Sequence, residues 1–232
     1  MKEAEKLFDE YAASYEVALS SAIAPSGETR EYFAERRVKW LQRCLQERRE
    51  TPRRVLDFGC GDGATTPVLL QILGAESALG LDASPKSIEL ALKKFANAQI
   101  KYVSLANFGP CGQFDLAYCN GVFHHIPPPE RAAAVTVIKR ALRPGGLFAF
   151  WENSPWSLAS RYVMSRCAFD RDAIMISPPE ARNLLQTGGF EILRTDFRFI
   201  FPNILRWLRG AEDFVYDLPF GAQYQVLCRK LS

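Results

Sequence analysis

The sequence lacks the features that define several classes of protein. Its 232 residues contain no apolar run near the roughly 18 residues expected of a membrane-spanning helix. The opening segment, MKEAEKLFDEY, does not show the basic-then-apolar order of a secretory signal. The net charge is only +3, from 29 Lys and Arg against 26 Asp and Glu, whereas a nucleic-acid-binding domain is expected to be clearly basic. We therefore expect neither a membrane span nor a nucleic-acid partner.

Cysteine and histidine are too scattered or too few to indicate a disulfide framework or a metal centre. The six cysteines include no C-x-x-C pair, and the only two histidines, His124 and His125, are adjacent. A chain of this length with 48% hydrophobic residues can bury a core without disulfides. We expect free thiols, a cytoplasmic location and no bound metal.

Short apolar segments alternate with helical stretches from residue 53 onward, which predicts a parallel sheet covered by helices. The first fifty residues show helical spacing of apolar residues, with a break at 24–28. Their arginine pairs alternate with glutamates, which predicts solvated, ion-paired helix faces. Strands are expected at 54–58, 78–82, 100–105, 114–119, 147–151, 190–200 and 223–229.

We interpret residues 1–232 as one domain made of four parts. The parts are an N-terminal helical cap (1–50), a cofactor-binding core (51–151), a lid-like insertion (152–176) and a C-terminal half of the sheet (177–232). Aromatic residues are concentrated late in the chain and predict core packing. Residues 201–209 combine apolar side chains with arginine and are the one segment that could lie on a membrane surface.

A glycine-rich turn, GCGDG at residues 59–63, follows the first expected strand and precedes a helix. Gly59, Gly61 and Gly63 permit a tight turn and let a ligand approach the backbone at the carboxyl end of the sheet. The second strand ends at Asp82, where a carboxylate can accept hydrogen bonds from ribose hydroxyls. This unit predicts a site for a cofactor that carries a nucleoside.

Two nucleoside cofactors are compatible with the turn. Gly59-x-Gly61-x-x-Ala64 satisfies a relaxed dinucleotide fingerprint, so an NAD(P)-binding oxidoreductase is one alternative. However, Asp57 directly precedes the turn, and a carboxylate there favours a cationic ligand over a pyrophosphate. S-adenosylmethionine (SAM) carries a sulfonium and an ammonium group and no phosphate, so we favour SAM. A non-catalytic SAM-binding protein is the remaining alternative.

The order of these motifs resembles that of the class I SAM-dependent methyltransferases, in their small-molecule branch of methyltransferase type 11/12. The matching segments are Asp57–Gly63, Leu81-Asp82, Phe114-Asp115-Leu116 and Leu142–Gly146, and the resemblance covers about residues 5–151. It implies a Rossmann-like, doubly wound α/β fold. The sheet of that fold is mostly parallel and seven-stranded, with an antiparallel last strand.

The resemblance also implies which residues bind SAM and its product S-adenosylhomocysteine (SAH). Asp57 and Gly59 would border the amino-acid part of SAM, and Asp82 would bind the ribose. Leu105 stands where the family often has an acidic residue that contacts the adenine, so its neighbours would substitute. The cofactor contacts predicted in this way are Asp57, Gly59, Cys60, Gly61, Gly63, Asp82, Ala83, Ala106, Asn107 and Asn120.

The acceptor side is predicted from the segments that follow the fourth and fifth strands. His125 has an ordinary pKa near neutrality and is a candidate general base. Glu152 follows the fifth strand and is a second candidate base. The expected reaction is methyl transfer from SAM, preferably to an oxygen of a small apolar or aromatic metabolite. Substrate contacts are predicted for Tyr11, Tyr15, His124, Trp156 and Arg161.

Overall fold

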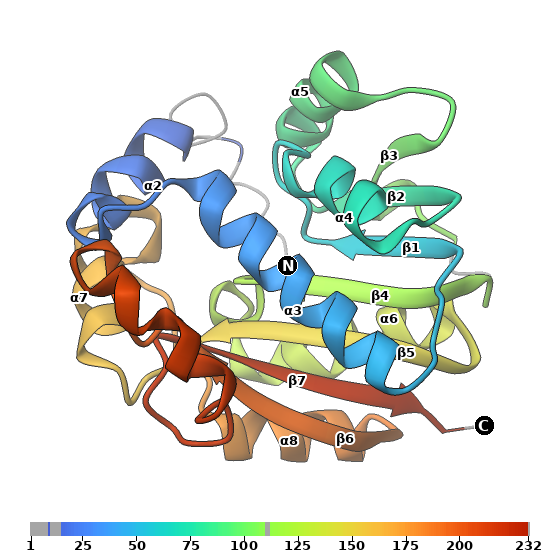
Figure 1. Ribbon diagram of the computed structural model, residues 1–232. Coiled ribbons are helices and arrows are strands. Elements are labelled where there is room, and N and C mark those ends of the chain that lie inside the picture. The colour runs from blue at the N-terminus through green and yellow to red at the C-terminus, as the bar shows by residue number, and fades with distance from the viewer. Residues whose placement is uncertain (1–8, 10–14, 110–111, 232) are drawn as a thin grey trace.

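A seven-stranded sheet forms the centre of the protein (Figure 1). The structure is a computed structural model that describes residues 9, 15–109 and 112–231. The strands are β1 (Arg54–Phe58), β2 (Ser77–Asp82), β3 (Ile100–Ser104), β4 (Phe114–Asn120), β5 (Leu142–Asn153), β6 (Phe190–Arg198) and β7 (Gln223–Lys230). Their order is β3-β2-β1-β4-β5-β7-β6.

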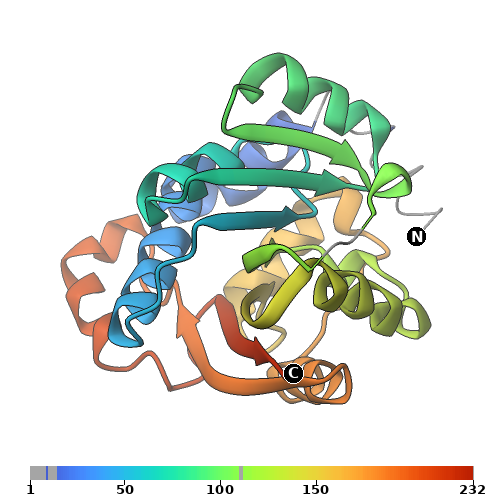
Figure 2. The ribbon, with the colours of Figure 1, turned by 90° about the vertical axis from the view of Figure 1, so that its right-hand side faces the viewer.

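The first five strands are parallel, and β7 runs antiparallel to both of its neighbours, β5 and β6. Figure 2 shows β1, β2 and β3 running in one direction. This arrangement confirms the predicted fold class. The strand β5 begins earlier than expected, because Leu142 also pairs with Phe114 at the start of β4, ahead of a register shift.

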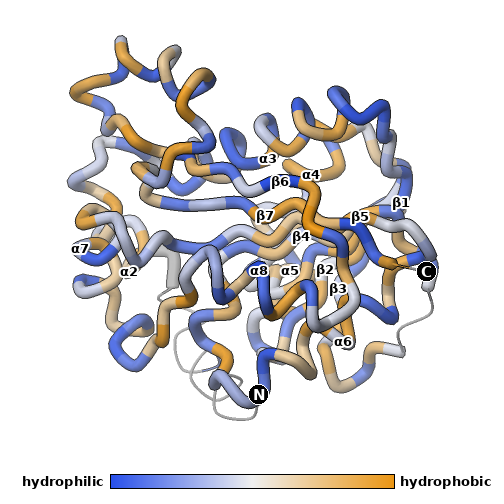
Figure 3. Tube along the Cα trace, turned by 90° about the horizontal axis from the view of Figure 1, so that it is seen from below, coloured by the Kyte–Doolittle hydropathy of each residue, from blue (hydrophilic) through white to orange (hydrophobic). Residues whose placement is uncertain are grey.

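Helices cover both faces of the sheet. Successive residues of β4 alternate between the faces: Leu116 and Tyr118 pack in one buried cluster, and Ala117 and Cys119 pack in the other. The first cluster includes residues of α3 (Arg30–Glu47) and α4 (Thr65–Leu73), and the second includes residues of α6 (Arg131–Ala141) and α8 (Pro178–Thr187). Figure 3 shows hydrophobic residues concentrated along the central strands.

Local signals explain where several helices begin. Ser84 caps α5 (Pro85–Phe95) by accepting a hydrogen bond from Ser87 N, and proline occupies the first helical position. Ser177 and Glu180 form a capping box at the start of α8. These caps fix the directions in which the helices return across the sheet.

The carboxyl end of the sheet carries additional short elements. They include α2 (Tyr15–Ile23) and α7 (Leu158–Arg166), which contact one another at the left of Figure 1. The insertion at 152–176 therefore packs against the N-terminal helices. The other short elements are η1 (Ala24–Ser26), η2 (Leu105–Asn107), η3 (Phe123–His125), η4 (Pro128–Glu130), η5 (Ala168–Asp170) and η6 (Asn203–Asp213).

Two expectations about the surface are wrong. Arg37 was expected on a solvated helix face, but it is only 6% exposed, because the face of α3 that carries it packs over the sheet. The late aromatic residues do not all enter the core: Phe197 is buried, whereas Trp207 is 75% and Phe214 is 85% exposed. In the part of the chain that the structure describes, no helix has the length and apolar character needed to cross a membrane.

Candidate functional site

The glycine turn, residues 59–63, lies between β1 and α4 at the carboxyl end of the sheet. Its three glycines have positive φ angles of 74°, 55° and 83°. A Cβ at Gly59 would approach Val122 to 2.2 Å, and one at Gly63 would approach Ala91 to 2.7 Å. A Cβ at Gly61 would meet nothing within 4 Å. Gly59 and Gly63 are therefore required for packing, while the space above Gly61 is open to a ligand.

Asp82 connects the glycine turn to the end of β2. Its Oδ2 accepts a hydrogen bond of 2.8 Å from Gly61 N, and its Oδ1 accepts one of 2.8 Å from Ser84 N. Burial raises the pKa of Asp82, and these two bonds oppose that effect. Each carboxylate oxygen can accept more than one bond, so the arrangement suits the two hydroxyls of a ribose. Ala83 is partly exposed beside it.

Asp9 lies next to this site. Its Oδ1 accepts a hydrogen bond of 2.6 Å from Ser84 Oγ and a longer one of 3.3 Å from Lys86 N. Its charge also contributes to the raised pKa of Asp82. Residue 9 is therefore held at the first turn of α5, beside the expected ribose position.

Asp57 lies beneath the glycine turn. It is 2% exposed and accepts a hydrogen bond of 2.7 Å from Thr66 Oγ1 of α4. Burial raises the pKa of Asp57 to about 7. The expected contact of Asp57 with the amino-acid part of SAM stays a prediction, and a carboxylate in this position favours a cationic ligand. Cys60 is also buried, in a cluster with residues of α5 and β3, so only its backbone could contact a cofactor.

An ion pair fastens the turn to α3. The guanidinium of Arg30 binds Asp62 through both nitrogens, at 2.8 Å and 2.5 Å. Burial opposes ionisation of Asp62, but this pairing holds its pKa below the ordinary value.

Asn120, at the end of β4, has a buried Oδ1 with no hydrogen-bond partner among the described residues. This oxygen is the group best suited to accept a hydrogen bond from the ammonium group of SAM.

The expected adenine side is formed by η2. Leu105 is partly buried against the main core, whereas Ala106 and Asn107 are exposed. A leucine in this position contributes to packing and offers no hydrogen bond to an adenine. The contacts predicted for Ala106 and Asn107 therefore stay predictions.

Glu152 binds the segment that carries the two histidines. It is 1% exposed, its Oε1 accepts a hydrogen bond of 2.8 Å from Phe123 N, and its Oε2 lies 2.7 Å from His124 Nδ1. Both oxygens are thus engaged within the protein. Glu152 therefore holds His124 in place, and its expected role as an acceptor-side base stays a prediction.

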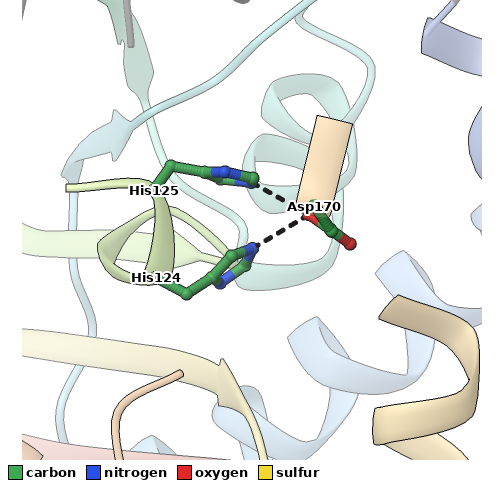
Figure 4. Close-up of side chains that lie close together, drawn as sticks. All are labelled: His124, His125 and Asp170. Carbon is green, nitrogen blue, oxygen red and sulfur yellow. Dashed lines mark ion pairs between the residues drawn. The ribbon is translucent and has the colours of Figure 1, made fainter. Parts of the chain in front are cut away.

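Asp170, from η5, lies beside the two imidazoles and contacts both (Figure 4). Its Oδ1 lies 3.4 Å from His124 Nε2 and 3.2 Å from His125 Nε2. Burial opposes charge on His124, but Glu152 and Asp170 outweigh it and raise the pKa of His124 to about 10. Burial and the neighbouring His124 lower the pKa of His125. The result is a charged His124 beside a neutral His125 at neutral pH.

Sequence reasoning did not single out Asp170. It is one of several charged residues in an insertion without clear periodicity, and no local pattern links it to the histidines.

His124, His125 and Asp170 also resemble a metal site, since their ligand atoms lie within 4.8 Å of one another. Histidine nitrogen and carboxylate oxygen suit a divalent transition metal, which would displace the proton from His124 on binding. Ion pairing accounts for the same geometry.

A cavity of about 370 Å³ adjoins this cluster and is called the acceptor cavity below. Its wall contains Asn120 and Gly121 at the end of β4, together with His124, His125 and Asp170. Residues of α2, α3, α7 and the segment 199–202 complete a largely apolar lining. The cavity therefore connects the expected position of the SAM methionine part with the histidine cluster.

The remaining predicted substrate contacts have different outcomes. Trp156 is half exposed and stacks on Phe197 with ring centroids 6.1 Å apart, and it does not line the acceptor cavity. Arg161 lines a second pocket, which shares Cys167 and Asp170 with the acceptor cavity. The substrate contacts expected of Trp156 and Arg161 stay predictions. Tyr11 lies outside the described residues, and of Tyr15 only its place at the start of α2 is described.

Comparisons with known proteins agree with this geometry. Residues 55–146 match a family model described as a methyltransferase domain. The chain is 31% identical over 149 residues to an uncharacterized methyltransferase of Synechocystis, covering 61% of this chain and 68% of that protein. It is 32% identical over 197 residues to a trans-aconitate 2-methyltransferase of Methylobacterium nodulans, covering 77% and 76%.

Solved structures show the same fold. A SAM-dependent methyltransferase from Mesorhizobium loti superposes with a TM-score of 0.56 at 24% identity, covering 76% of this chain and 90% of that one. Magnesium protoporphyrin IX methyltransferase from Synechocystis, solved with bound SAH, gives 0.57 at 20% identity, covering 84% and 83%. The sequence relatives and the motif-bearing turn at the carboxyl end of this sheet lead to one conclusion. The chain belongs to the class I SAM-dependent methyltransferases.

Proposed function

We propose that the chain transfers the methyl group of SAM to an oxygen of a small, mostly apolar or aromatic metabolite bound in the acceptor cavity. The observation that carries this proposal is the composition of the cavity wall. It contains Asn120 and Gly121, beside the glycine turn, and also His125 and Asp170. An acceptor in this cavity would lie between the methyl donor and a neutral imidazole.

Each residue of the site would have a separate role in the transfer. SAM supplies a methyl group bound to a sulfonium, and once that methyl group is transferred the remainder of SAM leaves as a neutral thioether. Asp82 would hold the ribose and Asn120 the ammonium group, so that the methyl group points into the cavity. Holding donor and acceptor in line can lower the barrier by about 7–11 kcal/mol.

His125 would accept the proton of an acceptor hydroxyl. Its Nε2 contacts Asp170 at 3.2 Å, which favours the tautomer that carries the proton on Nε2 and makes Nδ1 the basic nitrogen. Burial keeps the ring neutral by lowering its pKa, as a base requires. A positioned base of this kind contributes about 10²–10⁴ in rate.

The names of the relatives support oxygen as the accepting atom. Several are trans-aconitate 2-methyltransferases, and trans-aconitate offers only carboxylate oxygens as heteroatom nucleophiles. None of the relatives cited is named as a nicotinamide-dependent enzyme, so the dinucleotide alternative receives no support.

The test is a screen of metabolite extracts with methyl-labelled SAM, in which each labelled product is identified by mass spectrometry. We expect a product methylated on oxygen. His125→Gln should lower kcat by about 10²–10⁴ while leaving SAH affinity unchanged. Product labelled on nitrogen or carbon would contradict the proposed acceptor atom, and no labelled product in any extract would favour the non-catalytic alternative.

A second measurement tests the cofactor assignment. Asp82→Ala should weaken SAH binding at least about tenfold, because charge-assisted hydrogen bonds to the ribose are lost. Asp172→Ala, at an exposed position, is the matched control and should bind SAH like the wild type. Unchanged affinity in Asp82→Ala, measured by calorimetry, would show that the ribose assignment is wrong.

A further inference from the structure

We infer that Arg37 binds a carboxylate of the methyl acceptor, which makes the acceptor a hydroxylated apolar acid. The inference rests on the proposed function, because it assigns the bound molecule to the acceptor cavity. It adds the chemical class of the acceptor and the residue that selects it.

Arg37 is a buried cation with neutral partners only. It lines the acceptor cavity and is 6% exposed. Its Nε donates a hydrogen bond of 3.2 Å to Tyr118 Oη, and its Nη1 donates one of 3.0 Å to Gln223 Oε1. Among the described residues, no carboxylate forms an ion pair with Arg37 and no hydrogen bond is formed by its Nη2.

The other arginines that line the cavity differ in this respect. Arg30 is paired with Asp62, and Arg209 is paired with Glu28 at 2.8 Å. A buried charge without an opposite charge is costly, and proteins normally pair such groups. The guanidinium of Arg37 therefore has an unmet requirement that an anionic ligand can satisfy.

The surroundings hold Arg37 in a fixed position. Gln223 Nε2 donates a hydrogen bond of 2.9 Å to Asn153 Oδ1, which turns its Oε1 toward Arg37. Tyr118 is fully buried within β4. A planar guanidinium held in this way suits the two oxygens of a carboxylate.

The sheet order assigns this group to the acceptor and not to the cofactor. The glycine turn and Asp82 lie at the ends of β1 and β2, on one side of β4. The partners of Arg37 are Tyr118 on β4 and Gln223 on β7, with β5 between those strands. Arg37 thus lies over the other half of the sheet.

The carboxylate bound by Arg37 is distinct from the oxygen that is methylated. A guanidinium withdraws charge from a carboxylate and makes its oxygens poorer nucleophiles. The methylated oxygen therefore belongs to a separate hydroxyl near His125, while the apolar wall covers the body of the molecule. An aromatic or aliphatic hydroxy acid meets all three requirements.

The experiment compares acids with their own primary amides. SAH-saturated protein is titrated by calorimetry with 4-hydroxybenzoate, 4-hydroxycinnamate and 3-(4-hydroxyphenyl)propionate, and with the three corresponding amides. At least one acid should bind about tenfold or more tightly than its amide, the effect of one charge-assisted hydrogen bond or more. The preference should persist in Arg36→Gln, a matched control on the same helix, and disappear in Arg37→Gln.

Gln223→Glu keeps Arg37 in place, so it is the second test variant and is used if Arg37→Gln does not fold. Its new carboxylate would pair with Arg37 and should also abolish the preference for the acid. The inference is overturned if no acid is preferred over its amide, or if the preference survives in these variants. It is also overturned if SAH affinity falls about tenfold in Arg37→Gln, because the guanidinium would then bind the cofactor carboxylate.

Methyl transfer to the same acids is measured separately with labelled SAM. Acid-selective binding without transfer in this assay or the extract screen would contradict the proposed function and leave the Arg37 assignment standing. Methyl transfer without any preference for acids would contradict the Arg37 assignment and leave the proposed function standing.

Discussion

Replacing Glu152 with Gln tests whether this residue orients His124 or acts on the acceptor. Glu152 is 1% exposed and contacts His124 Nδ1 at 2.7 Å. Glutamine preserves the shape and can still accept the hydrogen bond from Phe123 N, but it removes the negative charge. His124 would then keep only Asp170 as an anionic partner.

The expected loss of stability follows from the buried ion pair. Removing one member of such a pair costs about 3–5 kcal/mol, because the remaining charge is left buried. The rise in the pKa of His124 from 6.5 to about 10 corresponds to about 5 kcal/mol as an upper limit. Since Asp170 retains part of the interaction, we expect a loss of about 3 kcal/mol at pH 7.

The loss should depend on pH in a defined direction. The folded pKa of His124 lies above its unfolded value, so its stabilising contribution is complete below pH 6.5 and is lost as the pH rises through about 10. The difference in unfolding free energy between wild type and Glu152→Gln should therefore be large at pH 7 and small at pH 10.

Urea unfolding followed by circular dichroism at these two pH values measures both effects. Glu191→Gln, an exposed position on β6, is the matched control and should unfold like the wild type. Equal stability of Glu152→Gln and wild type at pH 7, or a difference that is the same at both pH values, would refute the reasoning. Loss of activity in Glu152→Gln with unchanged stability would support the prediction that Glu152 is an acceptor-side base.

The remaining predictions concern the glycine turn and Asp57, which lies beneath it. Gly63→Ala should lower the unfolding free energy by about 2–5 kcal/mol, because its Cβ would lie 2.7 Å from Ala91 and its φ is also positive, whereas Gly61→Ala should cost about 1–2 kcal/mol from its positive φ alone and mainly weaken SAH binding. Urea unfolding and calorimetry distinguish the two, and wild-type SAH affinity in Gly61→Ala would contradict the open position above that residue. The raised folded pKa of Asp57, about 7, means that its contribution to stability is complete below 3.8 and is lost as the pH rises through 7. Asp57→Asn should therefore gain stability relative to wild type between pH 5 and pH 8, and a difference that does not change with pH would contradict its burial as an ionisable acid.

Local sequence signals determined much of the cofactor half. Glycines at 59, 61 and 63 specify a turn with positive φ, and all three have it. Serine is a residue type that favours helix starts, and Ser84 and Ser177 both lie at the N-caps of helices. Such features depend on residues within one turn of the chain, so a single sequence is sufficient to predict them.

The roles of Arg37, Glu152 and Asp170 could not be predicted in the same way. Arg37 lies on the apolar face of its helix, three residues after Ala34 and four before Leu41, but the sequence does not tell which groups contact its guanidinium. Glu152 follows the fifth strand, as the sequence indicates, but its partner, His124, comes from another strand end. Asp170 meets the histidines only because η5 packs against that strand end. These contacts depend on how distant segments meet in space.

The sequence by itself determined the fold, the glycine turn and the acid that follows the second strand, because periodicity, turn chemistry and caps act locally. Only the tertiary structure decided which charged groups are paired. It buried Asp57 beneath the turn, enclosed Glu152 with His124 and left Arg37 with neutral partners in the acceptor cavity. The pairing and burial of a charged side chain depend on every element that packs around it. They determine the pKa values of these side chains and the kind of ligand that the cavity can accept.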